Sequence, residues 1–99
     1  MPVADSPAPV RLQICAILSS ADEAEFALVR EETGVSESVL SKQVKLLEEA
    51  GYVAVRKATL ASRQRTWLAL TRAGRTAFAA HMQALTRLAQ TAANAIAAE

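Results

Sequence analysis

The sequence predicts one small α+β domain that is mainly α-helical and carries a small β-hairpin. Its 99 residues are 52% apolar and include both charge signs, which is typical of one globular unit with a single core. Aromatic residues are few whereas alanine is abundant, and this composition favours helices packed through small side chains over a sheet sandwich. Apolar residues recur at helical spacing at both ends of the chain, with two β-prone runs between them.

A first helix is expected from Pro9 to about Ser19, because proline is tolerated in the first turn of a helix. Residues 1–8 hold too little apolar bulk to pack, so we expect a flexible arm there and a folded domain over residues 9–99. The apolar residues of this helix share one face, which would dock on a core. They are Val10, Ile14, Ile17 and Leu18.

Two further helices joined by a tight turn are expected in the middle of the chain. Phe26 is placed in a short extended piece, and a helix follows over residues 27–33. Gly34 is the residue type that ends helices in a left-handed conformation, and Ser36 is a good N-cap. The next helix therefore runs from Ser36 to about Ala50. Its inward residues are Leu40, Val44 and Leu47.

An antiparallel hairpin is predicted from two β-prone runs, residues 52–55 and 66–70. The polar segment between them, residues 56–65, lacks the Asn-Gly or Asp-Gly of a two-residue turn, so we expect a longer, mobile loop. Trp67 is expected to anchor the returning strand on the core; the alternative is that it lines a small pocket. Thr71 is a suitable N-cap for a last helix that extends to about Ala97.

The charges are unevenly distributed although the net charge is only +1. Residues 1–37 carry two basic and seven acidic side chains, a net charge of −5, and this part would repel phosphate. Residues 38–75 carry eight basic and two acidic side chains, a net charge of +6. A nucleic-acid-binding face is therefore expected within the second segment.

Two groups of side chains in this basic segment could contact DNA. The outer face of the third helix is rich in serine and lysine, which suit phosphate oxygens and base edges, although an ordinary solvated helix face would look the same. The hairpin segment adds Arg56, Lys57, Arg63 and Arg65, and no acidic residue occurs between Val53 and Ile96. A purely structural loop usually mixes charge signs, so DNA contact is the favoured interpretation of this segment over a solvated turn.

Two runs carry a resemblance to a known family. The run TGVSESVLSKQVKLLEEAGYV, residues 33–53, resembles the helix-turn-helix of MarR-like winged-helix regulators. The run RQRTWLALTRAGR, residues 63–75, is similar to the wing, the returning strand and the start of the final helix in that group. The likeness spans about residues 10–90 and is closest to the short, stand-alone winged-helix DNA-binding domain proteins. It implies a winged helix-turn-helix with a three-helix core, a wing and a long C-terminal dimerisation helix.

The resemblance also implies a function and a set of contact residues. The molecule would be a homodimer that binds double-stranded DNA at a palindromic operator and regulates transcription, with repression expected because so small a domain has little surface left to recruit polymerase. Larger members enclose an effector pocket with additional helices, and this chain is too short for all of them, so no effector is assigned. The implied DNA-binding residues are Ser36, Glu37, Ser38, Ser41, Lys42, Lys45, Arg63, Gln64 and Arg65.

The last helix, about residues 71–97, is expected to form the dimer interface. It has a stripe of bulky apolar residues, and a large exposed apolar patch usually marks an association site. We expect it to pack against its twofold mate, together with the first helix; the alternative is that it folds back on its own subunit. The expected interface residues are Ile14, Phe78, Met82, Leu85, Leu88, Ala92 and Ile96.

Other functional classes find little support in the sequence. No Gly-rich phosphate loop, nucleophile elbow or acid–base pair beside a histidine is present, so neither an enzyme nor a cofactor is expected. Cys15 is interpreted as a small buried residue rather than a redox switch, and His81 receives no function. A single cysteine and a single histidine make a metal site unexpected.

Cellular location and partners are expected to match a DNA-binding protein. No stretch is long and apolar enough to span a membrane, and the first nine residues lack a signal-peptide pattern, so a cytoplasmic location is expected. The competing hypothesis is a winged-helix module that binds another protein and not DNA.

Overall fold

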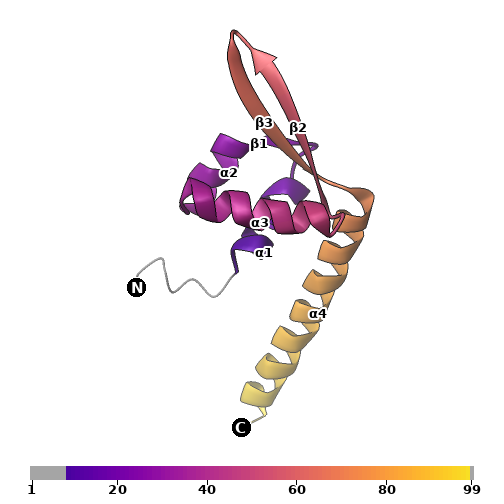
Figure 1. Ribbon diagram of the computed structural model, residues 1–99. Helices are drawn as coiled ribbons and strands as arrows, with labels where there is room; N and C mark the ends of the chain where they lie inside the picture. The colour runs from indigo at the N-terminus through magenta and orange to yellow at the C-terminus, as the bar shows by residue number, and fades with distance from the viewer. Residues whose placement is uncertain (1–8, 99) are drawn as a thin grey trace.

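The computed structural model describes residues 9–98 and places four helices and a three-stranded sheet within them (Figure 1). The expected fold class, mainly α with a small β-hairpin, is confirmed. The arm expected at residues 1–8 lies outside the described residues. The elements are α1 (Val10–Ser19), β1 (Ala24–Glu25), α2 (Phe26–Thr33), α3 (Glu37–Glu49), β2 (Val53–Leu60), β3 (Arg63–Leu70) and α4 (Arg72–Ala97).

The helix-turn-helix between α2 and α3 forms through the caps that the sequence indicates. Gly34 adopts a left-handed conformation with φ 72°, and its N–H donates to the carbonyl of Arg30 at 2.9 Å. The Ser36 hydroxyl accepts from the N–H of Val39 at 3.2 Å and so caps α3. The extended piece that we expect at Phe26 is instead β1, residues 24–25, because α2 already begins at Phe26.

The hairpin corrects the prediction of a long, mobile loop. Strands β2 and β3 pair along their full length, from Val53 opposite Leu70 to Leu60 opposite Arg63. Only Ala61 and Ser62 connect them, and both have positive φ, 50° and 65°. A two-residue turn with positive φ at both positions matches the twist of the paired strands, so this backbone conformation allows the ladder to continue to the tip.

The core lies between the three N-terminal helices and one face of the sheet, whose strand order is β1-β3-β2. The prediction that Trp67 anchors β3 on this core is wrong. Trp67 is only half-buried and lies on the opposite face of the sheet, whereas Leu68 and Leu70 point inward. The buried apolar residues are Ile14, Leu18, Ala24, Val29, Leu40, Val44, Leu47, Val53, Leu68 and Leu70.

The start of α4 is held closely against the segment that joins α3 to β2. The Thr71 hydroxyl donates to the carbonyl of Gly51 at 2.6 Å and accepts from the N–H of Gly74 at 3.0 Å. The N–H of Thr71 donates to the carbonyl of Tyr52 at 3.0 Å. Thr71 is therefore the N-cap of α4, as expected, and it also fixes where the helix leaves the domain.

The rest of α4 projects away from the body of the molecule (Figure 1). Every residue from Ala79 to Ala98 is exposed. The described chain measures 62 Å along its longest axis and has a radius of gyration of 16.0 Å, above the about 13 Å expected of a compact chain of this length. No helix within residues 9–98 has the length and apolar character needed to cross a membrane.

Ile14 corrects one expected member of the dimer interface. Its side chain is 0% exposed and lies in the core of its own subunit, so it is not available to a second copy. Apolar periodicity on α1 predicted the buried face, but this pattern alone does not distinguish a core position from an interface position.

Candidate nucleic-acid interface

The outer face of α3 is solvent-exposed and polar. The inward residues Leu40, Val44 and Leu47 are buried, so the opposite side of the helix faces solvent. Ser36 is exposed as well, but its hydroxyl is engaged as the N-cap and lies 3.3 Å from the hydroxyl of Ser38. The expected contact residues that are exposed on α3 are Glu37, Ser38, Ser41, Lys42 and Lys45.

A surface hollow between α3 and the β2–β3 hairpin joins the two expected contact elements. Lys45 reaches this hollow from α3 and Lys57 reaches it from β2. Ser41 and Thr66 line it as well, and the acidic residues at its border, Glu37 and Glu48, come from α3. Lys45 of the helix and Lys57 of the hairpin therefore lie on one side of the molecule, as a duplex-binding surface requires.

The hairpin, which we call the wing, presents two different faces. Side chains alternate along a strand, and Val55 packs on the core, so Lys57 lies on the face directed toward α3. Arg65 pairs with Ala58, the neighbour of Lys57 along β2, and therefore lies on the opposite face. Arg63 lies two residues before Arg65 along β3 and shares its face, so the structure separates both arginines from the lysines of the hollow. Arg63 and Gln64 are exposed at the tip.

Two arginines of the wing are paired with carboxylates from the segment around β1. Arg56 donates to both carboxylate oxygens of Glu23, at 2.6 and 3.3 Å, and its guanidinium lies 5.6 Å from the ring centre of Trp67. The hydrogen bond to Glu23 raises the pKa of Arg56. Arg65 donates to a carboxylate oxygen of Glu25 at 3.3 Å.

The remaining basic residues of the segment fall into two classes. Arg75 donates to the backbone carbonyls of Ser19 and Ala21, at 3.4 and 3.0 Å, and so ties α4 to the end of α1. The five other cations of residues 38–75 make no ion pair with any residue that the structure describes. They are Lys42, Lys45, Lys57, Arg63 and Arg72.

The partners Glu23 and Glu25 were not among the sequence-predicted site residues. Their spacing of two carried a signal, since residues at that spacing lie on the same face of an extended segment. Their arginine partners could not be identified from it, because Glu23 and Arg56 are 33 positions apart and meet only through the register of the sheet.

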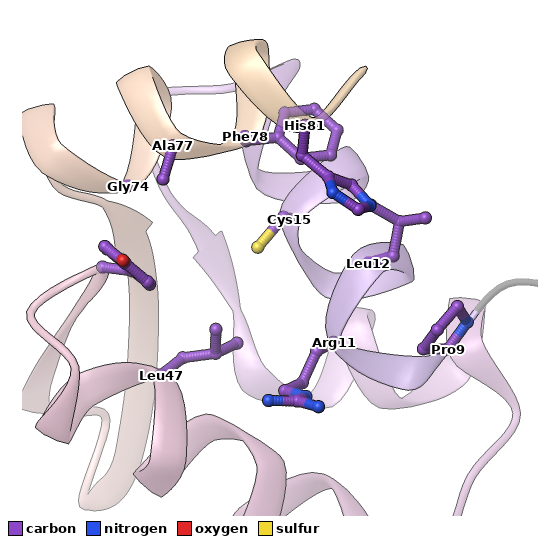
Figure 2. A pocket seen from close by; sticks show the side chains of 10 residues that line it. Pro9, Arg11, Leu12, Cys15, Leu47, Gly74, Ala77, Phe78 and His81 are labelled. Carbon is purple, nitrogen blue, oxygen red and sulfur yellow. The ribbon is translucent and has the colours of Figure 1, made fainter. Parts of the chain in front are cut away.

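A second hollow, of about 320 Å³, lies where α1, the end of α3 and the start of α4 meet (Figure 2). The Cys15 sulfur points into this space, and burial raises the pKa of the thiol. Within residues 9–98, no three His, Cys, Asp or Glu side chains gather as a metal site. The lining residues are Pro9, Arg11, Leu12, Cys15, Leu47, Tyr52, Gly74, Ala77, Phe78 and His81.

Comparisons with known proteins agree with this architecture. An uncharacterised protein of Methanocaldococcus jannaschii is 30% identical over 81 residues, which cover 82% of this chain and 88% of the relative. The structure of a transcriptional regulator homologue from Pyrococcus horikoshii superposes with a TM-score of 0.78 at 24% identity, covering 90% of this chain and 91% of that one.

The resemblance to MarR-like regulators is confirmed by a further structure and by a family model. A MarR-family transcriptional regulator from Silicibacter pomeroyi is 27% identical with a TM-score of 0.57; the match covers 76% of this chain and 51% of the regulator. The model of the winged helix DNA-binding domain matches residues 10–89. This family is defined by DNA binding and not by catalysis, in agreement with the expectation that the protein is no enzyme. The chain belongs to the winged helix DNA-binding domain family.

Proposed function

We propose that this protein is a sequence-specific, double-stranded DNA-binding transcriptional regulator that acts as a repressor. The observation that carries the proposal is the shared hollow between α3 and the wing, which brings Lys45 and Lys57 to one side. In this arrangement α3 enters a major groove, about 12 Å wide, and the wing contacts the adjacent minor groove or backbone. Lysines then bind phosphates, while Ser38 and Ser41 reach base edges.

A mobility-shift assay with genomic fragments tests DNA binding. We expect the wild-type protein to retard a subset of fragments, and the double variant Lys42→Ala/Lys45→Ala to bind those fragments at least about tenfold more weakly, because phosphate contacts are lost. Arg87→Ala is the matched control, since it removes an exposed cation of α4, which projects away from the wing. It should leave binding unchanged.

The opposite result would favour a different class of function. If no fragment is retarded, or if the double variant and the Arg87→Ala control behave like the wild type, α3 does not bind DNA. The scaffold would then act as a module that binds another protein. A genome-wide pull-down of bound DNA would give the operator and its half-site spacing, and a promoter fusion would test repression by showing higher expression when the gene is deleted.

We also propose that the protein is a homodimer joined through α4. From Ala79 to Ala98 every residue of this helix is exposed, although bulky apolar side chains line it. Met82 and Leu85 are 39% and 37% exposed, and Leu88 and Ile96 are 66% and 71% exposed. An apolar stripe of this length is typical of an association surface. Sedimentation equilibrium at micromolar concentration tests the proposal, and a monomer would contradict it.

A dimer of this kind suits the proposed operator. Twofold symmetry would present two copies of α3, which can reach successive major grooves about 34 Å apart when the spacing is correct. The dimer residues that we propose on α4 are Phe78, Met82, Leu85, Leu88, Ala92 and Ile96.

A further inference from the structure

We infer that Glu23 and Glu25 act as internal counter-charges of the wing, so that Lys57 and Arg63, and not Arg56 and Arg65, carry its attraction for DNA phosphate. The inference rests on the proposed function, because it states which cations of the wing bind the duplex. Arg56 and Arg65 then become positioning residues that fasten the wing to β1.

The register of the sheet explains how the carboxylates reach the arginines. Glu25 of β1 pairs with Trp67 of β3, and Trp67 in turn pairs with Arg56 of β2, so the three side chains form a row across one face. Arg65 lies two residues from Trp67 along β3 and therefore shares that face. The acidic segment is thus fixed beside the arginines by backbone pairing.

The ion pairs have the geometry to hold the guanidinium groups. Arg56 makes two hydrogen bonds to Glu23, and its stacking on Trp67 limits its rotation further. The Arg65 side chain is only 38% exposed and that of its partner Glu25 only 27% exposed, so phosphate must displace a partly shielded carboxylate. By contrast, Lys57 and Arg63 make no ion pair within the described residues.

The salt dependence of DNA binding distinguishes paired from free cations. A cation that binds phosphate releases a condensed counterion, and the logarithm of the association constant changes with the logarithm of salt concentration by about 0.9 for each such contact. A cation that keeps its carboxylate partner releases none. The slope therefore counts only the wing cations that contact the duplex.

The test compares salt slopes for a labelled random-sequence duplex of about three helical turns, between about 50 and 200 mM KCl. We expect Arg63→Ala to make the slope shallower by about one unit per subunit, and Arg65→Gln to leave it unchanged. Glu25→Gln should make it steeper by up to about one unit per subunit, because Arg65 becomes free to bind phosphate. A gain in binding cannot arise from misfolding.

Glu32→Gln is the matched control for net charge. Glu32 lines the same surface hollow as Glu23 and Glu25 but makes no ion pair within residues 9–98, so its change should not alter the slope. If Arg65→Gln makes the salt slope as much shallower as Arg63→Ala does, the inference is wrong, but the proposed function is unaffected. A wild-type protein that binds no duplex would overturn both.

Discussion

At the scale of single residues, Gly74 shows how one position fixes the exit of α4. It is buried in the first turn of the helix, and its N–H is bound by the cap Thr71. A Cβ built at this position would lie 2.1 Å from the carbonyl oxygen of Tyr52 and 3.1 Å from a side-chain carbon of Leu70. Glycine is required here for close approach of the backbone and not for an unusual φ.

We therefore expect Gly74→Ala to destabilise the protein. Alanine favours a helix over glycine by about 1 kcal/mol, but the new methyl group meets backbone, which cannot turn away as a side chain can. The net loss should be about 1–3 kcal/mol of the free energy of unfolding, measured by urea denaturation. Thr76→Ala, an exposed change in the same helix, should stay within about 0.5 kcal/mol. Equal stability of the two variants would contradict this account.

At the scale of elements, the helices could be predicted because their signals are local. Ser36 and Thr71 cap α3 and α4 through hydrogen bonds to residues three positions ahead, and Gly34 ends α2 within its own turn. The hairpin turn could not be predicted, since Ala61 and Ser62 are not the residues that favour positive φ. Its conformation follows from the long ladder on both sides.

The candidate interface was predictable only in part, because local sequence signals do not determine strand register. The outward side of α3 follows from its inward residues, whereas the face that each wing cation occupies depends on strand register. Arg63 and Arg65 looked equivalent in the sequence, but only Arg65 has a carboxylate partner in the described structure. Register also determines that the acidic segment before α2 lies beside the wing.

The turn yields a prediction at this scale. Replacing Ala61 and Ser62 by Asn and Gly should stabilise the protein by about 1 kcal/mol. The reason is that the left-handed conformation costs an L-residue with a Cβ about that much free energy. Thermal and urea unfolding would measure the gain. Ser62→Ala keeps a Cβ at the same φ and should bring no gain. If the Asn-Gly variant is no more stable than wild type, positive φ at the tip costs less than we infer.

At the scale of the whole molecule, α4 accounts for the elongated shape. At about 1.5 Å per residue its 26 residues span about 39 Å, and only its first two turns hold buried or half-buried residues. Helices in proteins gain most of their stability from packing an apolar face, and beyond Phe78 the apolar face of this helix stays exposed in the subunit. A second copy of the same helix would cover this face. Folding of α4 would then be linked to dimer assembly, and the dimer would set the spacing of the two DNA-binding faces.

The final prediction separates assembly from folding. Leu85 is 37% exposed and lies where no residue of α4 is buried, so Leu85→Glu should leave the subunit fold intact but place a charge in the proposed apolar interface. We expect a monomer by sedimentation and operator binding at least about a hundredfold weaker, because the two half-sites are no longer bound together. Gln83→Glu introduces the same charge on the opposite side of the helix and should remain dimeric. A Leu85→Glu protein that stays dimeric would show that α4 is not the interface, and one that is monomeric with undiminished affinity would show that a single subunit suffices for binding.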